Sequence, residues 1–498
     1  MLLRIAGVGV AVSAAAVAAV ASAGSGARPR PAVPLAARTR QPASSTTVLS
    51  GPPAAIAAGA AADLFSRAPV VVLASARSAA SVARAATLAA RAHAPLLLVS
   101  RAAGGTATWA EVAALRPRAV LAVGVSGPLL SARLPRIPVA TGLAQLPRMR
   151  AARPAGHVAV LVPAAPSGVA VIAATATARA AGAAVIAVHG ADPRADPAAI
   201  AALAAGRPLR VIAVGAGFGP VARLAERVAV ADTGVQLPGG GQVIFPLHRL
   251  VALYGYPGTP ALGALGDQGL AASIGRAKRI AAWYRPLSAV PVVPTLEILA
   301  TVAQSSPGPD GTYSYQTPVA DLRPWVRRAT AAGLYVVLDL QAGRASLLAQ
   351  AMRYSALLRL PDVGLALDPE WKLQPGQRPL RQIGSVSVTA VNQVIGWLAG
   401  LTARYHLPQK LLVLHQFRLS MIQGEGRLDT GQDALAIVIH MDGQGTPLEK
   451  LQTWRAITAA APPGVYFGWK NFFVKDHPML TPRQTMANTP QPLMISYE

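Results

Sequence analysis

The chain has 498 residues, 52% of them hydrophobic, no cysteine, and a formal net charge of +25 from 46 basic and 21 acidic residues. Its length indicates two or three domains, its hydrophobic content excludes a disordered polycation, and the lack of cysteine excludes disulfides, thiolate nucleophiles, thiolate metal sites and a lipoprotein anchor. The positive charge favours anionic partners such as nucleic acid, acidic lipid or an anionic wall polymer, although an Arg- and Ala-rich composition is also expected from a GC-rich genome.

The N-terminus has the pattern of a secretory signal peptide. Met1 to Arg4 carry a positive charge, residues 5–20 are apolar, and Ala21-Ser22-Ala23 is a small-x-small cleavage site. We therefore predict a signal peptide over residues 1–23. The alternative is an uncleaved anchor helix, for which the apolar run is short and Ala-rich. Residues 24–48 are rich in Ala, Arg, Pro, Ser and Thr without periodicity, which predicts a flexible spacer.

Residues 49–236 alternate short apolar runs with Ala-rich helical segments, which predicts β-α-β units and a parallel sheet. The pattern occurs twice, and each copy closes with a Gly-rich turn. The second turn, at residues 214–220, reads G-x-G-x-G rather than the dinucleotide-binding G-x-G-x-x-G, so we interpret it as a packing turn. The predicted strands are residues 70–74, 95–99 and 119–124 in the first copy and residues 158–162, 183–188 and 211–215 in the second.

The segments VVLAS (residues 71–75), APLLLVS (94–100) and VLAVG (120–124), with their second copy, resemble the cell-wall-binding repeat type 2 of Gram-positive surface proteins. The resemblance extends over residues 54–230. The sequence differs from that family after the first strand, where Ser-Ala-Arg-Ser-Ala-Ala replaces the family's Asp-Ala element. The resemblance implies attachment to anionic wall polymers, which fits a basic and exported protein.

A second domain is predicted over residues 243–498, after a Gly-rich linker at residues 237–242. Eight strand-like runs alternate there with helical segments, which matches a (β/α)8 barrel of about 250 residues. The second run is the least regular because Pro291 interrupts it and Pro294 follows it directly. We thus expect an α/β chain with an N-terminal parallel-sheet repeat domain and a C-terminal (β/α)8 barrel. The eight runs are residues 250–254, 289–293, 334–339, 363–368, 410–415, 434–440, 464–469 and 493–497.

The fourth of these runs ends in two carboxylates, Asp368 and Glu370, separated by a proline. Side chains two apart on a strand share a face, so we expect both to point the same way. The C-terminal strand ends of a barrel meet at one mouth, where active sites lie. Polar and aromatic residues follow the other strands as well. The candidate substrate-binding residues are Trp371, Tyr254, His415, His440, Asp442, Trp469, Lys470 and Asn471.

The segment LALDPEW (residues 365–371) resembles the strand end of secreted TIM-barrel glycosidases, notably lysozyme-type muramidases and chitinase-like enzymes. The resemblance implies that Glu370 is the general acid and that Asp368 orients it or tunes its charge. Glycoside cleavage uses one acid to protonate the leaving oxygen and a second carboxylate to attack or to activate water. We expect Asp339, one strand earlier, to be that second carboxylate. The muramidase pattern has an Asp at the end of the first strand, where this sequence has Tyr254-Gly255-Tyr256.

Structural roles are the alternative for each candidate. Asp368 and Glu370 could cap a helix or form ion pairs, Asp339 could pair with Arg344 or Lys470, and the histidines could be interior residues. Lys470 could also neutralise the acids of a catalytically silent barrel. A divalent-ion site has suitable ligand types but lacks the His-x-His of metal-dependent barrels, so we expect no metal and no cofactor. Its ligands would be His415, His440, Asp339, Asp442 and Glu370.

Other classes of function lack their motifs. There is no G-x-S-x-G nucleophile motif and no nucleic-acid-binding module. We expect a secreted or cell-wall-associated protein that binds a cell-wall glycan or anionic wall polymer, without nucleic acid and without stable membrane insertion after signal cleavage. It is either a glycoside hydrolase or a non-catalytic glycan-binding or envelope-stabilising protein. The pKa of Glu370 separates the two, because an acid needs it raised and a pairing with Lys470 would lower it.

Overall fold

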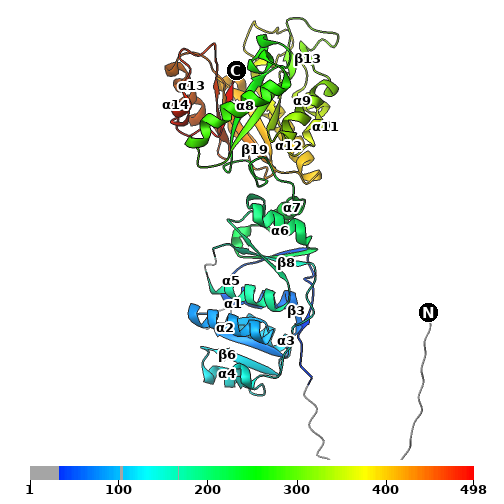
Figure 1. Cartoon of the computed structure of the whole chain (residues 1–498), viewed down its shortest axis with the longest axis vertical. Helices are drawn as coiled ribbons and strands as arrows, with labels where there is room; N and C mark the ends of the chain where they lie inside the picture. The colour runs from blue at the N-terminus through cyan, green and yellow to red at the C-terminus, as the bar shows by residue number, and fades with distance from the viewer. Residues whose placement is uncertain (1–32, 101–104, 166–167) are drawn as a thin grey trace, which may run out of the picture.

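The computed structural model describes residues 33–100, 105–165 and 168–498, which form two lobes stacked along the long axis of the molecule (Figure 1). The predicted signal peptide and the start of the predicted spacer lie outside the described residues. The chain is of the α/β class, with parallel sheets in the N-terminal lobe and a closed barrel in the C-terminal lobe.

The N-terminal lobe contains two four-stranded parallel sheets with the same strand order. In each sheet the first predicted strand lies between the second and the third, and a fourth strand pairs with the outer edge of the third. Val, Ile and Leu make up most of these strands, as is usual for parallel sheets covered by helices. The sheets are, in spatial order, β5 (Leu96–Val99), β4 (Val70–Ser75), β6 (Ala119–Val123) and β7 (Val139–Ala140), and β9 (Ala184–Val188), β8 (Val158–Pro163), β10 (Arg210–Val214) and β2 (Thr46–Leu49).

Helices α1 (Pro53–Leu64) and α5 (Val169–Ala180) contact each other between the two sheets (Figure 1). Both are Ala-rich, and their buried alanines share one core with Val71 of the first sheet and with Val160 and Ile212 of the second. The two sheets therefore belong to one packed unit. The remaining helices of this lobe are α2 (Ala79–Ala92), α3 (Gly105–Leu115), α4 (Gly127–Arg133), α6 (Pro197–Gly206) and α7 (Val221–Ala231).

The prediction of a flexible spacer over residues 24–48 is wrong for the part that the structure describes. Strand β1 (Arg38–Thr39) pairs with β3 (Phe65–Arg67), and β2 pairs with β10. Strands of two and four residues are too short to show the alternation that identifies a strand in a sequence. These pairings make the segment part of the N-terminal lobe.

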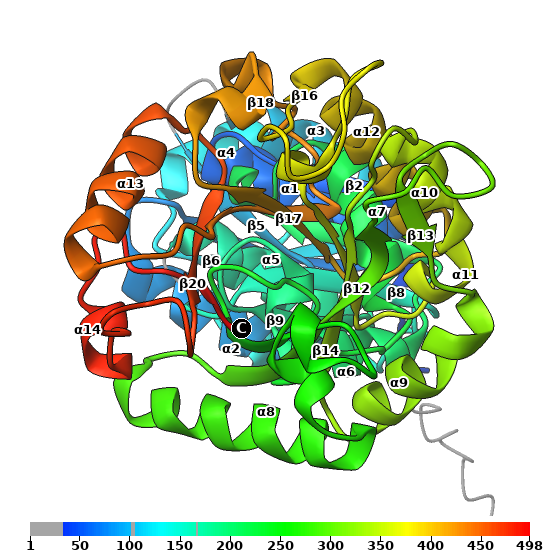
Figure 2. The ribbon, with the colours of Figure 1, turned by 90° about the horizontal axis from the view of Figure 1, so that it is seen from above.

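The C-terminal lobe is a closed barrel of eight parallel strands surrounded by helices (Figure 2). Strand β11 pairs with both β12 and β21, which closes the ring. The second run, predicted at residues 289–293, is placed too early: the strand begins at Val292, is the longest in the barrel, and is not interrupted by Pro294 near its start. Glu297 therefore lies inside a strand. The barrel strands are β11 (Arg249–Gly255), β12 (Val292–Ala303), β14 (Tyr335–Leu340), β15 (Val363–Leu367), β17 (Lys410–Gln416), β19 (Leu435–Met441), β20 (Tyr466–Asn471) and β21 (Met494–Tyr497).

Alternate residues of each strand point into the barrel and form an apolar layer followed by a polar one. From β14, Tyr335 and Val337 join an interior apolar cluster, and Asp339 follows as a buried polar residue. From β17, Val413 joins the same cluster, and His415 follows two residues later. The polar layer lies at the C-terminal ends of the strands. The surrounding helices include α8 (Leu270–Tyr284), α9 (Val319–Ala331), α10 (Leu347–Arg353), α11 (Ser355–Leu358), α12 (Val388–Arg404), α13 (Pro447–Ala460) and α14 (Pro482–Met486).

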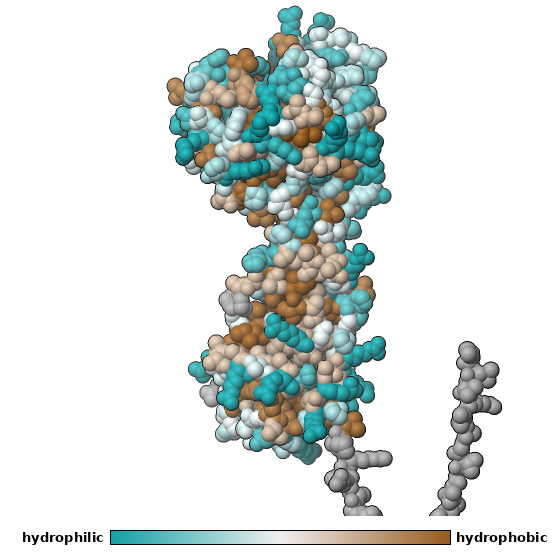
Figure 3. Space-filling model, viewed as in Figure 1, coloured by the Kyte–Doolittle hydropathy of each residue, from teal (hydrophilic) through white to brown (hydrophobic). Residues whose placement is uncertain are grey.

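The two lobes meet at a narrow waist (Figure 3), where Asp433 of the barrel lobe pairs with two arginines of the N-terminal lobe. Its Oδ2 lies 2.7 Å from Arg194 Nη2, and its Oδ1 lies 2.6 Å from Arg227 Nη2. Arg194 also pairs with Asp192 at 2.7 Å. Gln242, the last residue of the predicted linker, is buried and donates hydrogen bonds to backbone carbonyls of the N-terminal lobe. The waist is thus held by directed polar contacts.

We expect Asp433→Asn to lower the free energy of unfolding by about 2 kcal/mol, because the Arg194 guanidinium, with only 5% of its side chain exposed, loses one of its two carboxylate partners. Urea unfolding at low and high salt measures this change, and the loss should shrink at high salt. Asp310→Asn, in an exposed loop, is the control. An Asp433→Asn protein with an unchanged urea midpoint at low salt would contradict the expectation.

Candidate active site

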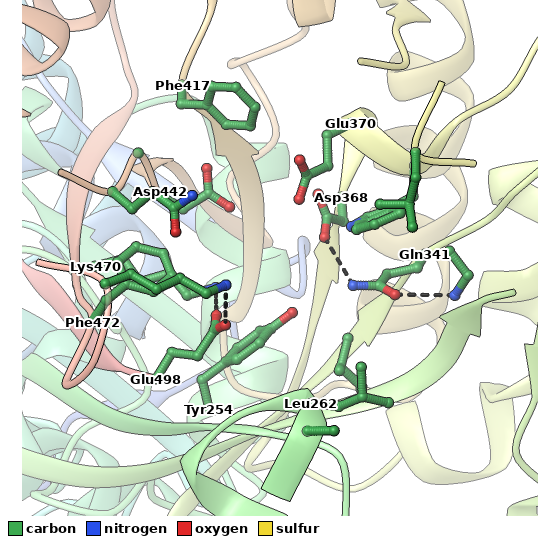
Figure 4. Close-up of a pocket in the computed structure, with 18 residues that line it drawn as sticks. Tyr254, Leu262, Gln341, Asp368, Glu370, Phe417, Asp442, Lys470, Phe472 and Glu498 are labelled. Carbon is green, nitrogen blue, oxygen red and sulfur yellow. Dashed lines mark hydrogen bonds and ion pairs between the residues drawn. The ribbon is translucent and has the colours of Figure 1, made fainter. Parts of the chain in front are cut away.

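A cavity of about 410 Å³ opens at the C-terminal ends of the barrel strands (Figure 4). Its volume falls within the range of about 300–1,000 Å³ that is usual for small-molecule sites. The wall combines acidic, basic and aromatic side chains. The residues that matter for its chemistry are Asp368, Glu370, Asp442, Glu498, Lys470, Lys475, Tyr254, Trp371, Phe417 and Phe472.

Three carboxylates, Asp368, Glu370 and Asp442, lie together on this wall. Asp368 follows β15, Asp442 follows β19, and Glu370 lies in the single 3-10 turn Pro369–Trp371. One oxygen of each lies within 4.8 Å of an oxygen of the other two. Glu370 reaches the cavity through this turn and not through the strand alternation that the sequence suggests. Gln341 donates a hydrogen bond of 3.3 Å to Asp368 Oδ2 (Figure 4).

The surroundings of Glu370 and Asp442 drive their pKa values apart. Burial, and after it the charge of Asp442, raises the pKa of Glu370 to about 7. Burial would also raise the pKa of Asp442, but the neighbouring His415 and the Lys470 ammonium hold it below its usual value. Near neutral pH, one carboxyl of the pair can hold a proton while the other is ionised. Enzymes obtain an acid and a base from two carboxyls in this way.

His415 links Asp442 to a carboxylate deeper in the barrel, Glu297. Its Nδ1 lies 3.2 Å from Asp442 Oδ2, and its Nε2 lies 3.0 Å from Glu297 Oε1. Burial favours the neutral ring, yet these carboxylates raise the pKa of His415 well above the usual value. Burial and the charge of His415 lower the pKa of the neighbouring His440, which contacts Ser496 Oγ at 3.2 Å. Neither histidine lines the cavity, so the structure does not place them as substrate contacts.

Asp339 is buried beside Tyr254, outside the group of three carboxylates and outside the cavity wall. The Tyr254 hydroxyl donates a hydrogen bond of 2.9 Å to Asp339 Oδ2. Burial raises the pKa of Asp339 to about 6. Asp339, the second carboxylate expected from the sequence, thus lies away from Glu370 on the cavity wall, whereas Asp442 lies next to it.

Lys470 forms its ion pair with Glu498 and not with Glu370. The two charged atoms, Lys470 Nζ and Glu498 Oε2, lie 2.8 Å apart (Figure 4). The same ammonium lies 3.5 Å from the centre of the Tyr254 ring, where a cation–π contact adds to its stability. The Lys470 charge lowers the pKa of Glu370, but burial and Asp442 outweigh it, and this pKa remains raised to about 7.

Trp469 and Asn471 do not reach the cavity. The Trp469 ring packs against Trp454 of α13 on the outside of the barrel, and its Nε1 donates a hydrogen bond of 2.9 Å to Asn471 Oδ1. Both residues lie one position away from the inward-facing Lys470, and strand alternation turns them outward. Trp371 and Tyr254 do line the cavity. The sequence pattern did not single out Phe417 or Phe472, which follow strands β17 and β20 directly.

The oxygens of Asp368, Glu370 and Asp442 are close enough to share a cation. The positive charges of His415 and Lys470 already act on Asp442, and they would repel a metal ion at this place. The histidines of the alternative metal-ligand set are occupied by Glu297 and Ser496. The donor set therefore fits proton chemistry better than a metal centre.

No helix in the part of the chain that the structure describes is both long and apolar enough to cross a membrane. Comparisons of the chain with protein-family models, with curated proteins and with solved structures found no match.

Proposed function

We propose that the protein is an exported, cell-wall-associated glycoside hydrolase that acts on a wall or extracellular glycan. The observation that carries the proposal is the pair of Glu370 and Asp442. Their oxygens lie within 4.8 Å of each other, and their pKa values are shifted in opposite directions. The aromatic rings of Trp371, Phe417 and Phe472 on the same wall supply faces on which sugar rings stack.

In this mechanism Glu370 protonates the leaving glycosidic oxygen, and the Asp442 carboxylate attacks the anomeric carbon from the other face. Retaining glycosidases hold their carboxyl groups about 5–5.5 Å apart, and inverting enzymes about 6.5–9.5 Å apart. The nearest oxygens of Glu370 and Asp442 lie within 4.8 Å of each other, which is compatible with the retaining spacing, and we propose the retaining course on this basis. Glu370, now ionised, then takes a proton from the water that releases the sugar from Asp442. Asp368 keeps the local charge low, because burial raises its pKa well above the usual value.

The N-terminal lobe would attach the enzyme to anionic wall polymers. Support comes from the resemblance to cell-wall-binding repeats, from the net charge of +25 and from the shared strand order of the two parallel sheets. In this proposal each sheet with its helices represents one repeat. The signal peptide over residues 1–23 would direct export.

The test is hydrolysis of purified peptidoglycan and of a small polysaccharide panel by residues 24–498, with the release of reducing ends as the readout. We expect release from at least one substrate, with the anomeric configuration retained in the first product. Binding of the same glycans without release would instead support the non-catalytic, glycan-binding function. Inversion would overturn the role of Asp442 as nucleophile.

The pH dependence of this hydrolysis should report both carboxyls. Activity is expected to fall as the pH rises through about 7, because Glu370 then loses its proton. Replacing the His415 cation with Gln removes the charge that keeps Asp442 ionised, so its pKa rises and the acid limb of kcat/KM moves to higher pH. His440→Gln is the matched control, because burial keeps that ring neutral. An acid limb that stays in place in His415→Gln would contradict this role.

A further inference from the structure

Four arginines surround a second, smaller pocket on the N-terminal lobe. The pocket has a volume of about 150 Å³, and its lining contains no acidic residue. Its apolar part is formed by Leu35, Ala36 and Pro69. Its basic part is formed by Arg38, Arg67, Arg116 and Arg118.

Backbone hydrogen bonds bring these arginines together from distant parts of the chain. Arg38 and Arg67 are register partners in the β1–β3 pair. The Arg118 N–H donates to Pro69 O at 2.8 Å, which ties the third segment to the second. Arg116 has a φ of 49°, in the left-handed region that residues other than glycine rarely adopt. Backbone contacts within the N-terminal lobe therefore bring together the segments that line the pocket.

Within the described residues, none of the four side chains takes part in an ion pair. By contrast, Arg194 and Arg227 at the waist pair with carboxylates. Each guanidinium offers five N–H donors, and all four arginines are exposed to solvent. Their donors and positive charges are therefore accessible to an anion at the pocket.

We infer that this arginine pocket binds a phosphate or carboxylate group of an anionic wall polymer. The inference rests on the proposed wall attachment and assigns it to named residues. The planar guanidinium matches both anions with two parallel hydrogen bonds. The pocket volume of about 150 Å³ is half of the roughly 300 Å³ at which the range of small-molecule sites begins. The pocket therefore admits one anionic group of a longer chain.

The experiment compares two quadruple variants of residues 24–498 that carry the same net charge. The pocket variant has Arg38, Arg67, Arg116 and Arg118 replaced with Gln. The control variant has four exposed arginines on helices replaced with Gln, namely Arg84, Arg91, Arg179 and Arg223. Calorimetric titration with tripolyphosphate and with oligogalacturonate separates phosphate from carboxylate recognition. We expect the pocket variant to bind the preferred anion about tenfold or more weakly, since charge-assisted hydrogen bonds are lost, and the control to stay within about twofold.

Equal losses in the two variants would overturn the inference, because general charge would then explain binding. Stronger pocket-dependent binding of single-stranded DNA than of either probe would overturn it in favour of nucleic acid. Sedimentation with purified walls, before and after extraction of their anionic polymers, tests attachment separately. If both variants still sediment with walls, the protein attaches to walls, but it does so without the arginine pocket. If the probes bind through the pocket but the protein does not sediment with walls, the pocket is an anion site and the proposed wall attachment is contradicted.

Discussion

Asp442→Asn is expected to hydrolyse the glycan about 10³-fold more slowly than the native protein, because the amide cannot attack the anomeric carbon. The substitution keeps the shape of the side chain and its place beside Glu370. Initial rates of reducing-end release at saturating substrate measure the loss in kcat. With Asp442→Ala, added azide should restore turnover, since a small anion can enter the space that the carboxylate leaves.

The matched comparison for this variant is Asp339→Asn. Asp339 accepts a hydrogen bond from Tyr254 and lies away from the cavity wall, so its amide variant should keep most of the activity. A large loss in Asp339→Asn together with near-native activity in Asp442→Asn would contradict the assignment of the second carboxylate. Such a result would instead favour Asp339, at the end of the preceding strand, as the second carboxylate.

Glu370→Gln is expected to lose about 10²–10⁴-fold in kcat on natural glycans, because the leaving oxygen must then depart without a proton. The loss in kcat/KM, which reports the glycosylation step, should be much smaller on aryl glycosides whose phenol is a good leaving group, since such a group needs little acid assistance. Rates of the native protein and of the variant, measured side by side on both substrate types, give the ratio of the two losses. A general structural defect would lower both rates equally.

The control for Glu370→Gln is Glu226→Gln, an exposed glutamate on α7. It makes the same chemical change outside the barrel and should leave both rates unchanged. Equal losses on natural and aryl substrates in Glu370→Gln would contradict the role of Glu370 as general acid.

The alternation of strand residues explains how much of the site the sequence could predict. The inward positions of β20 are Gly468 and Lys470, so Trp469 and Asn471 face outward although both belong to the strand end. The period of two, applied to every strand and not only to the one with Asp368, is enough to separate these residues from the cavity. Seven of the eight barrel strands could be predicted because each is a short apolar run bounded by turns, whereas the run predicted at residues 289–293 overlaps β12 only at its first two residues.

Other features depended on contacts that a sequence does not show. Glu297 lies inside β12, which continues to Ala303. The prolines in this segment suggested a strand that ends before Glu297. The pairing of Asp442 with Glu370 depends on the turn that carries Glu370 to the cavity wall. The arginine pocket joins Arg38, Arg67 and Arg118, which are far apart in the chain and come together only through backbone pairing.

The most direct test of the central claim is a pH titration of the Glu370 and Asp442 carboxyls by carbon-13 NMR on protein labelled at aspartate and glutamate side chains. Glu370→Gln and Asp442→Asn assign the two signals. The account predicts that Glu370 titrates near pH 7 and that Asp442 titrates below the usual value for an aspartate. A Glu370 carboxyl that is already ionised near pH 4, or an Asp442 carboxyl that holds its proton longer than Glu370, would contradict the acid–nucleophile pair.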